Sequence, residues 1–383
     1  MPVTLLEGHA DFSREFRGDG IVPSTLEVLD QLGLLGRVFE LPHSRHQTIA
    51  IRTAGGSIPL VEFDRVRTRH PYYVRLSQAR FLELLASVAA DYPSFRLVMG
   101  ARVEQLIEEG GVIEGVRYRD QGGWHTVGAS LTVGADGRFS RVRDLAGLPS
   151  TRSAYPIDFL WFRLPTSPTD LDSVGGVYVG DAGCAYLRNR GRQWEVGYWL
   201  PKGSYQRLRA LGISELRLMV DRLLPWLADR TSQLQDWRQT SLLSVESRRV
   251  RRWYRPGLLL IGDAAHVMSP IGGVGINLAI QDAVVTANLV GPRLRAGNVR
   301  VRDLAAVQRR REGATRLVQV LQDLALQTIL KPSANPGVHA LATLIQDVPA
   351  LRDFRARVFA FGGIGHERLQ IVAPPTHLAT PVR

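Results

Sequence analysis

The chain has 383 residues, which suffices for two domains of ordinary size. Its composition is that of a globular protein, with 45% hydrophobic and 22% charged residues. No apolar run reaches the roughly 18 residues of a membrane span, and the first seven residues lack the basic and apolar regions of a signal peptide. Cys184 is the only cysteine, which excludes intramolecular disulfides and cysteine metal clusters and favours a reducing, cytoplasmic setting.

The chain is strongly basic, with a formal net charge of +12 and a pI near 10.4. Such a charge could indicate a nucleic-acid or acidic partner. Lysine occurs only at Lys202 and Lys331, however, and the many arginines are dispersed among carboxylates. Because no base-reading motif accompanies the charge, we interpret it as a coding bias toward arginine and predict no nucleic-acid partner.

The N-terminal pattern predicts a buried strand over residues 3–7 that ends in Glu7. In dinucleotide-binding folds, an acid at the end of the second strand binds ribose hydroxyls, about 20 residues after a GxGxxG loop. No such loop precedes Glu7 here. Residues 3–7 are therefore either an ordinary edge strand or the second strand of a fold whose first strand, loop and helix are missing.

The next segments alternate between loops, helices and hairpins. Arg17 lies in a glycine-containing loop before a leucine-rich helix, and residues 43–73 alternate as a hairpin does. A further helix is expected near Gln78, with Ser77 as its N-cap. An exposed first helical turn would explain Gln78 as well as a ligand contact would, and a position in a surface loop is the alternative explanation for Arg17.

Residues 96–135 predict a β-meander with glycine turns, ending at Asp136-Gly137 before a helix capped by Ser140. From residue 155 to about 250 the pattern changes to aromatic strands. These strands predict a sheet with one face that is either plain core or a pocket for a flat organic molecule. Helices are expected after residue 290. Gly363-x-Gly365 lacks a third glycine and predicts a turn.

Residues 258–290 carry the most specific pattern. A buried strand over 258–261 ends in Gly262-Asp263, and a loop with Pro270, Gly272 and Gly275 leads into a helix that begins near Ile276 and Asn277. The helix is expected to bury one stripe, formed by Ile276, Ile280, Ala283, Ala287 and Val290. A glycine-rich loop before a helix N-terminus suits an anionic or electron-rich ligand, because its backbone amides are free and glycine allows close approach.

The ordered set Gly-Asp-Ala-Ala-His, Pro, Gly-x-Gly-x-Asn and Asp-Ala resembles the second flavin-binding motif of the FAD-dependent aromatic hydroxylases, the para-hydroxybenzoate hydroxylase class of group A monooxygenases. Residues 131–143 resemble a further signature of that family. The resemblance implies an α/β fold with a Rossmann-like, N-terminally truncated FAD-binding domain, a β-sheet-rich substrate domain and C-terminal helices. It implies FAD contacts for Glu7, Arg17, Gln78, Asp136, Gly262, Asp263, Pro270, Gly272, Gly275, Ile276 and Asn277.

The expected domain division follows the same resemblance. The FAD-binding domain would comprise residues 1–45, 74–150 and 245–298, the substrate domain residues 46–73 and 151–244, and a helical segment with a tail residues 299–383. The implied function is a monooxygenase that uses NAD(P)H and dioxygen to hydroxylate a small aromatic or polyketide-like substrate through a flavin hydroperoxide. A flavin-dependent reductase or halogenase on the same fold, or a truncated non-catalytic fragment, are the alternatives.

The sequence leaves several features of this function open. It identifies no catalytic base and no metal site, and it does not distinguish NADH from NADPH. The substrate and the oligomeric state are also undetermined.

Overall fold

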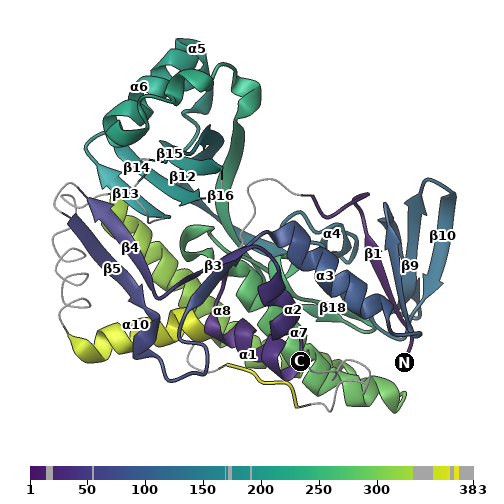
Figure 1. Cartoon of the computed structure of the whole chain (residues 1–383). Coiled ribbons are helices and arrows are strands. Elements are labelled where there is room, and N and C mark those ends of the chain that lie inside the picture. The colour runs from purple at the N-terminus through teal and green to yellow at the C-terminus, as the bar shows by residue number, and fades with distance from the viewer. Residues whose placement is uncertain are drawn as a thin grey trace.

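The computed structural model describes residues 1–13, 20–53, 56–168, 170, 175–189, 192–330, 348–362 and 366–370. Its largest element is an eight-stranded, mostly antiparallel sheet (Figure 1). In spatial order its strands are β19 (His266–Val267), β16 (Ser241–Val250), β12 (Ser150–Pro165), β15 (Gln193–Pro201), β14 (Gly183–Asn189), β13 (Gly176–Gly180), β4 (Thr48–Thr53) and β5 (Gly56–Glu62).

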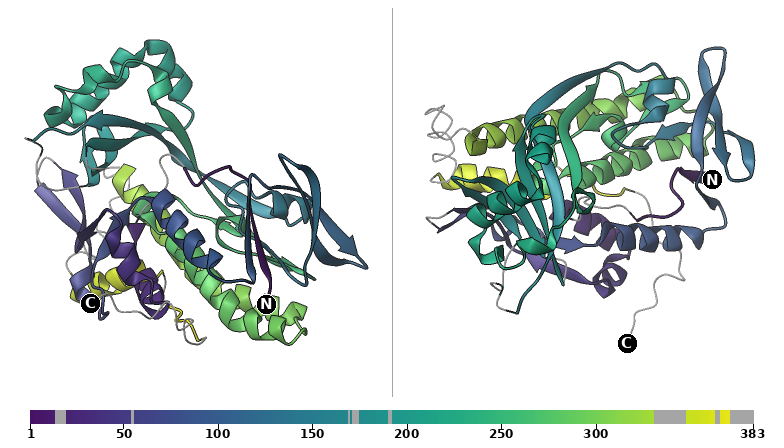
Figure 2. Two further views of the ribbon diagram at one scale, coloured as in Figure 1. Left: turned by 45° about the vertical axis from the view of Figure 1, so that its right-hand side comes forward. Right: turned by 90° about the horizontal axis from the view of Figure 1, so that it is seen from above.

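The two faces of this sheet pack against different helices because side chains alternate along each strand. On β15, Trp194, Val196 and Tyr198 join a core beneath the helices α5 (Tyr205–Leu211) and α6 (Ile213–Leu223). Trp199, on the opposite face, packs with Leu326 of the long helix α8 (Val301–Leu330). Figures 1 and 2 show α5 and α6 outside the sheet and the long helices on its other side.

Two small sheets carry further parallel pairings. β1 (Val3–Glu7) pairs in parallel with β7 (Phe95–Met99), and β11 (Thr132–Gly134) pairs in parallel with β18 (Leu258–Leu260), which also pairs with β17 (Tyr254–Arg255). Two antiparallel sheets complete the set. They are the meander of β8 (Arg102–Glu109), β9 (Val112–Asp120) and β10 (Gly123–Gly128), and the sheet of β2 (Gly20–Ile21), β6 (Tyr73–Leu76) and β3 (His43–His46).

The remaining helices surround these sheets. They are α1 (Pro23–Gln31), α2 (Leu35–Glu40), α3 (Gln78–Ala90), α4 (Arg141–Leu145), α7 (Gly275–Arg295) and α10 (Pro349–Phe361). One hydrophobic core is formed around β18, α7 and the first turns of α8. The strand β1 and the β8–β10 meander lie at the end of the molecule opposite β4 and β5 (Figures 1 and 2).

The predicted α/β architecture is confirmed, and two local expectations are wrong. The strand over residues 3–7 forms but is not buried, because within the described residues it pairs only with β7, and Val3 and Leu5 remain 45% and 47% exposed. The buried face of α7 also differs from the expected stripe. Ala283 is exposed, whereas the polar Gln281 and Asp282 are buried. Asp282 lies inward because three buried groups donate to it, and Gln281 accepts from Glu367 N.

The segment Ile271–Arg295, which contains α7, is long and apolar enough to cross a membrane by length and composition alone. Half of its most apolar 18-residue stretch is buried inside the protein, and its inward face holds a carboxylate and an amide. It is therefore the core helix of this fold and does not indicate a membrane span.

Candidate flavin site

The site begins where β18 ends and the chain turns at the 3-10 helix η5 (Gly262–Ala264). Gly262 has a φ of +60°, and a Cβ at this position would lie 3.0 Å from the Cβ of Ala279 on α7. Glycine is required here both by the left-handed backbone and by the close approach of strand and helix. The next residue, Asp263, is half-buried, and a Cβ added at Gly275 would lie 4.0 Å from its Oδ1. The turn therefore places a carboxylate beside the start of α7.

The N-terminus of α7 presents free backbone donors. Its N-cap, Val274, offers no side-chain cap, and the first hydrogen bond within this turn runs from Leu278 N to Val274 O. The amides of Gly275, Ile276 and Asn277 thus have no acceptor within the helix. Together with the positive end of the dipole of a 21-residue helix, they favour an anionic or electron-rich group.

The loop before α7 contains the 3-10 helix η6 (Ile271–Gly273), for which Pro270 is the N-cap. Gly272 and Gly273 have φ values of +80° and +62°. A side chain at Gly272 would collide with the Phe359 ring of α10 at 2.7 Å, whereas none of the described atoms lies within 4 Å of a Cβ at Gly273. Gly272 therefore serves packing against α10, and Gly273 leaves open space at the loop.

The side chain of Asn277 joins this loop to the N-terminal part of the chain. Its Oδ1 accepts from Val22 N at 3.1 Å and from Thr25 Oγ1 at 2.9 Å, and its Nδ2 donates to Gly20 O at 2.9 Å and Gly273 O at 3.4 Å. All of its hydrogen-bonding capacity is used inside the protein. Any ligand contact of Asn277 would come from its backbone amide.

A buried ionic cluster supports the turn from behind. Asp282 of α7 is fully buried and accepts from Gly262 N at 2.9 Å, from His266 Nε2 at 2.6 Å and from Arg311 Nε of α8 at 2.8 Å. Burial by itself raises the pKa of Asp282, but the charges and hydrogen bonds of His266 and Arg311 outweigh it and lower that pKa below its ordinary value. Asp282 thus fixes the amide of Gly262, and with it the position of Asp263.

The Asp136-Gly137 segment is organised around the start of α4. Asp136 Oδ1 accepts from Ser140 Oγ at 2.5 Å and its Oδ2 accepts from Val142 N at 3.0 Å. Ser140 is the N-cap, as predicted, and accepts from Arg143 N at 3.0 Å. Arg143 is buried and donates to Ala264 O at 3.4 Å, so this helix is tied to the turn that holds Asp263.

The other predicted contact residues are more dispersed. Glu7 lies at the C-terminal end of β1, where its Oε1 accepts from His9 N at 2.9 Å and lies 2.7 Å from His9 Nδ1. Gln78 is the first residue of α3, and its buried Oε1 has no hydrogen-bond partner among the residues the structure describes. Arg17 lies outside the described residues, as does Gly363-x-Gly365.

These features fit a flat, anionic cofactor such as FAD. The uncapped amides of α7 can donate to a ligand, the open space at Gly273 can admit one, and the buried oxygen of Gln78 lacks a partner among the described residues. FAD carries a planar ring system and a pyrophosphate, which are the groups that free helix amides and glycine-lined loops accept.

The aromatic sheet face lies against this loop. Ile271 of η6 packs in one cluster with Phe159, Trp161 and Trp199 of the large sheet. Phe159 stacks on Trp161 at 6.0 Å and meets Trp199 edge-on at 5.2 Å. This buried face of β12 and β15 therefore forms an apolar surface, called the apolar roof below, beside the loop of residues 270–274, the flavin loop.

Three functional side chains on α8 were missed by the sequence reasoning. Besides Arg311, they are Gln319, which donates to Val267 O at 3.2 Å, and Gln322, which donates to Ser269 O at 2.9 Å and Ile271 O at 2.7 Å. A signal did exist, because Arg311 continues the buried stripe of Leu304 and Val307. A charged residue on the buried face of a helix indicates a buried partner.

Comparison with known proteins agrees with this geometry. A family model described as FAD binding domain matches residues 1–320. The 6-methylpretetramide 4-monooxygenase of Streptomyces rimosus is 36% identical over 375 residues, which are 94% of this chain and 86% of that protein. The 12-dehydrotetracycline 5-monooxygenase/anhydrotetracycline 6-monooxygenase of the same species is 30% identical over 72% of this chain and 54% of its own length.

Solved structures show the same fold. The OxyS anhydrotetracycline hydroxylase from Streptomyces rimosus superposes with a TM-score of 0.76 at 23% identity, covering 94% of this chain and 70% of that one. P. aeruginosa PqsL in complex with 2-aminobenzoylacetate gives 0.74 at 20% identity, covering 88% and 92%. With the family match and the 36% identical relative, these observations establish that the chain belongs to the FAD binding domain family and is an FAD-dependent oxidoreductase.

Proposed function

We propose that this protein hydroxylates a phenolic ring of a flat, polycyclic polyketide, using NAD(P)H and dioxygen. The observation that carries the proposal is the aromatic sheet face against the flavin loop, where Ile271 packs against the cluster that contains Phe159, Trp161 and Trp199. Flat, apolar walls with few polar groups suit a fused-ring substrate. The 36% identical relative is a monooxygenase of 6-methylpretetramide, which supports this substrate class.

FAD, when bound, supplies the activation of dioxygen, and the protein supplies orientation and electrostatics. The free amides at Gly275 and Ile276 would stabilise negative charge that develops at the near edge of the flavin. Asp263, fixed through Gly262 and Asp282, would hold the ribityl and pyrophosphate side of the cofactor. The apolar roof would exclude water from the reacting groups.

One polar group on the roof is available to position the substrate. Trp199 is 5% exposed, and its Nε1 has no hydrogen-bond partner among the described residues. A buried indole N–H is costly to leave unpaired. We propose that it donates to a carbonyl or phenolic oxygen of the substrate. Trp199→Phe keeps an aromatic side chain but removes this donor together with part of the indole ring system, so the KM for the phenol is expected to rise about tenfold.

The test is a turnover assay with FAD, NADPH or NADH, and a series of phenolic polycycles that includes 6-methylpretetramide. The proposal expects substrate-stimulated NAD(P)H oxidation, matching dioxygen uptake and a product heavier by one oxygen atom. Saturation of the substrate without dioxygen, or a halogenated product, would show that the reaction class is different.

A further inference from the structure

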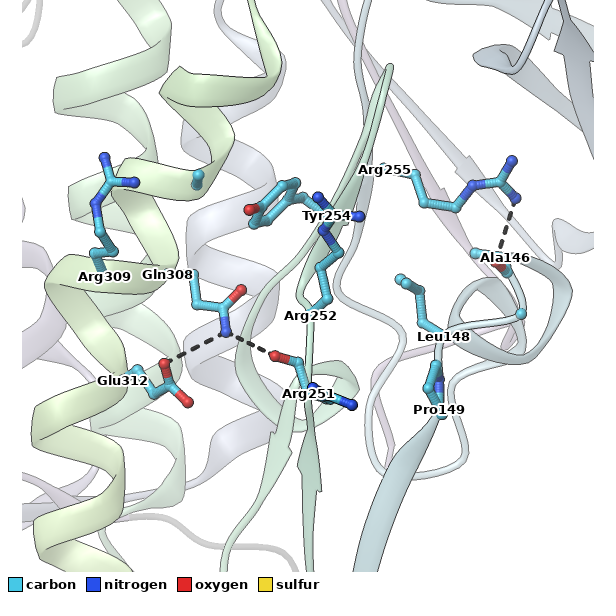
Figure 3. Close-up of a pocket in the computed structure, with 12 residues that line it drawn as sticks. Ala146, Leu148, Pro149, Arg251, Arg252, Tyr254, Arg255, Gln308, Arg309 and Glu312 are labelled. Atoms are coloured by element: carbon cyan, nitrogen blue, oxygen red, sulfur yellow. Dashed lines mark hydrogen bonds between the residues drawn. The ribbon is translucent and has the colours of Figure 1, made fainter.

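A cleft outside the flavin site described above lies between α8, β17 and the connection from α4 to β12 (Figure 3). Its volume is about 800 Å³. Four arginines line it: Arg251, Arg252, Arg255 and Arg309. Figure 3 shows Arg309 on α8 and the other three arginines on the segment of residues 251–255, which ends in β17. None of these residues belongs to the flavin site described above.

The positive charge in this cleft is only partly neutralised. Arg255 donates to Ala146 O at 3.2 Å and to Glu108 Oε1 at 2.5 Å. The one acidic residue of the lining, Glu312, is already paired with Arg316 at 2.5 Å. In the part of the chain that the structure describes, no carboxylate pairs with Arg251, Arg252 or Arg309. Three guanidinium groups therefore remain available for an anion.

The strand side of the cleft is held in place by one buried side chain. Gln308 of α8 accepts from Trp253 N at 3.0 Å and donates to Arg251 O at 3.0 Å, so both of its polar atoms bind the backbone that carries the arginines (Figure 3). The guanidinium of Arg252 lies over the Tyr254 ring, 5.0 Å from its centroid. A fixed backbone lowers the entropic cost of ordering long side chains around a ligand.

We propose that this arginine cleft binds the phosphate groups of an adenine nucleotide. Guanidinium groups form strong, often bidentate hydrogen bonds to phosphate. The volume exceeds what a single phosphate fills and lies in the range of small-molecule sites. Tyr254 and the apolar side chain of Leu148 provide surface for a base or ribose. The ligand is either the adenosine end of NAD(P)H or a free nucleotide; only the first source rests on the proposed function.

Calorimetric titration of the FAD-supplemented full chain with ADP tests the site directly. Arg251→Ala and Arg309→Ala are each expected to weaken ADP binding about tenfold, because each removes a charge-assisted hydrogen bond. Arg251→Lys, which keeps the charge, should lose less. Arg207→Ala removes an exposed arginine of α5 and should leave binding unchanged. Equal ADP binding by all variants would overturn the proposal, as would displacement of ADP by equimolar sulfate.

Steady-state kinetics distinguishes NAD(P)H from a free nucleotide as the ligand of the arginine cleft. If NADPH is the ligand, the same variants raise its KM about tenfold and leave kcat unchanged; an unchanged KM with weakened ADP binding assigns the cleft to a free nucleotide. The flavin-to-protein ratio is measured for each variant, and ADP binding lost together with flavin would overturn the assignment. Because the ADP titration needs no substrate, it gives its answer even if no phenol is hydroxylated.

Discussion

Replacing Asp282 with asparagine probes the ionic cluster behind the flavin turn. The carboxylate binds three donors, on Gly262, His266 and Arg311, and the side chains of Asp282 and Arg311 are 0% and 1% exposed. An asparagine has one oxygen, so at least one donor would face an amide N–H₂, and the Arg311 cation would stay buried without a counter-charge. Breaking a buried ion pair from one side costs about 3–5 kcal/mol. We expect Asp282→Asn to lose that much free energy of unfolding.

Urea unfolding monitored by tryptophan fluorescence measures this loss. Glu312→Gln on α8 is the matched control, because its pair with Arg316 is partly exposed and such pairs contribute only about 0.2–1 kcal/mol. Arg311→Met combined with Asp282→Asn should cost less than the sum of the single changes, since no buried cation then remains. If Asp282→Asn lowers the free energy of unfolding no more than Glu312→Gln does, the cluster of Asp282, His266 and Arg311 does not stabilise the fold.

The pKa of Asp282 determines how the difference in unfolding free energy between the wild type and Asp282→Asn changes with pH. The pKa of Asp282 is lowered in the folded state, so its contribution is fully present above the unfolded carboxyl pKa of about 3.9. It is lost as the pH falls through the lower, folded value. The stability difference between the wild type and Asp282→Asn should therefore shrink as the pH falls into strong acid.

Three further outcomes follow from local geometry. Gly262→Ala forces a side chain to φ +60° and to 3.0 Å from the Ala279 Cβ, and should cost about 1–3 kcal/mol and lower the flavin-to-protein ratio. Burial raises the pKa of Asp158, but hydrogen bonds from Lys202 and from backbone amides outweigh burial and lower that pKa overall. The ionised carboxylate therefore stabilises the fold above its unfolded pKa. Because Lys202→Met removes part of this stabilisation, acid unfolding of that variant should begin at higher pH than that of the wild type. Burial raises the pKa of Cys184 to about 11, so its thiol should resist alkylation at neutral pH until the chain is unfolded in urea.

The sequence predicted the parts of the fold that depend on local pattern. Alternating residues and glycine turns predicted the hairpin of β4 and β5 and the meander of β8–β10, because strand periodicity and turn chemistry are set within a few residues. Exposure of β1 could not be predicted in this way. It depends on which strands pair with both edges, and that is a property of the assembled sheets.

In the site, too, local features could be predicted from the sequence and features that depend on distant contacts could not. The Gly262-Asp263 turn and the free start of α7 are local, and the motif indicated both. The buried face of α7 was predicted wrongly because hydrophobic periodicity assumes apolar neighbours, whereas Asp282 is buried by partners on η5, β19 and α8. Gln308, which fixes the backbone of the arginine cleft, likewise depends on contacts more than 50 residues apart.

The bonds of Asn277 have a consequence for how the protein is made. They connect the start of α7 to Val22 and Gly20, 255 and 257 positions earlier in the chain. Contacts of such separation close very long loops, which slows their formation. During synthesis, the N-terminal segment must wait until α7 has left the ribosome before the flavin loop can be completed. We therefore expect the cofactor to bind near the end of translation, and nascent chains that stop before α7 to bind no flavin.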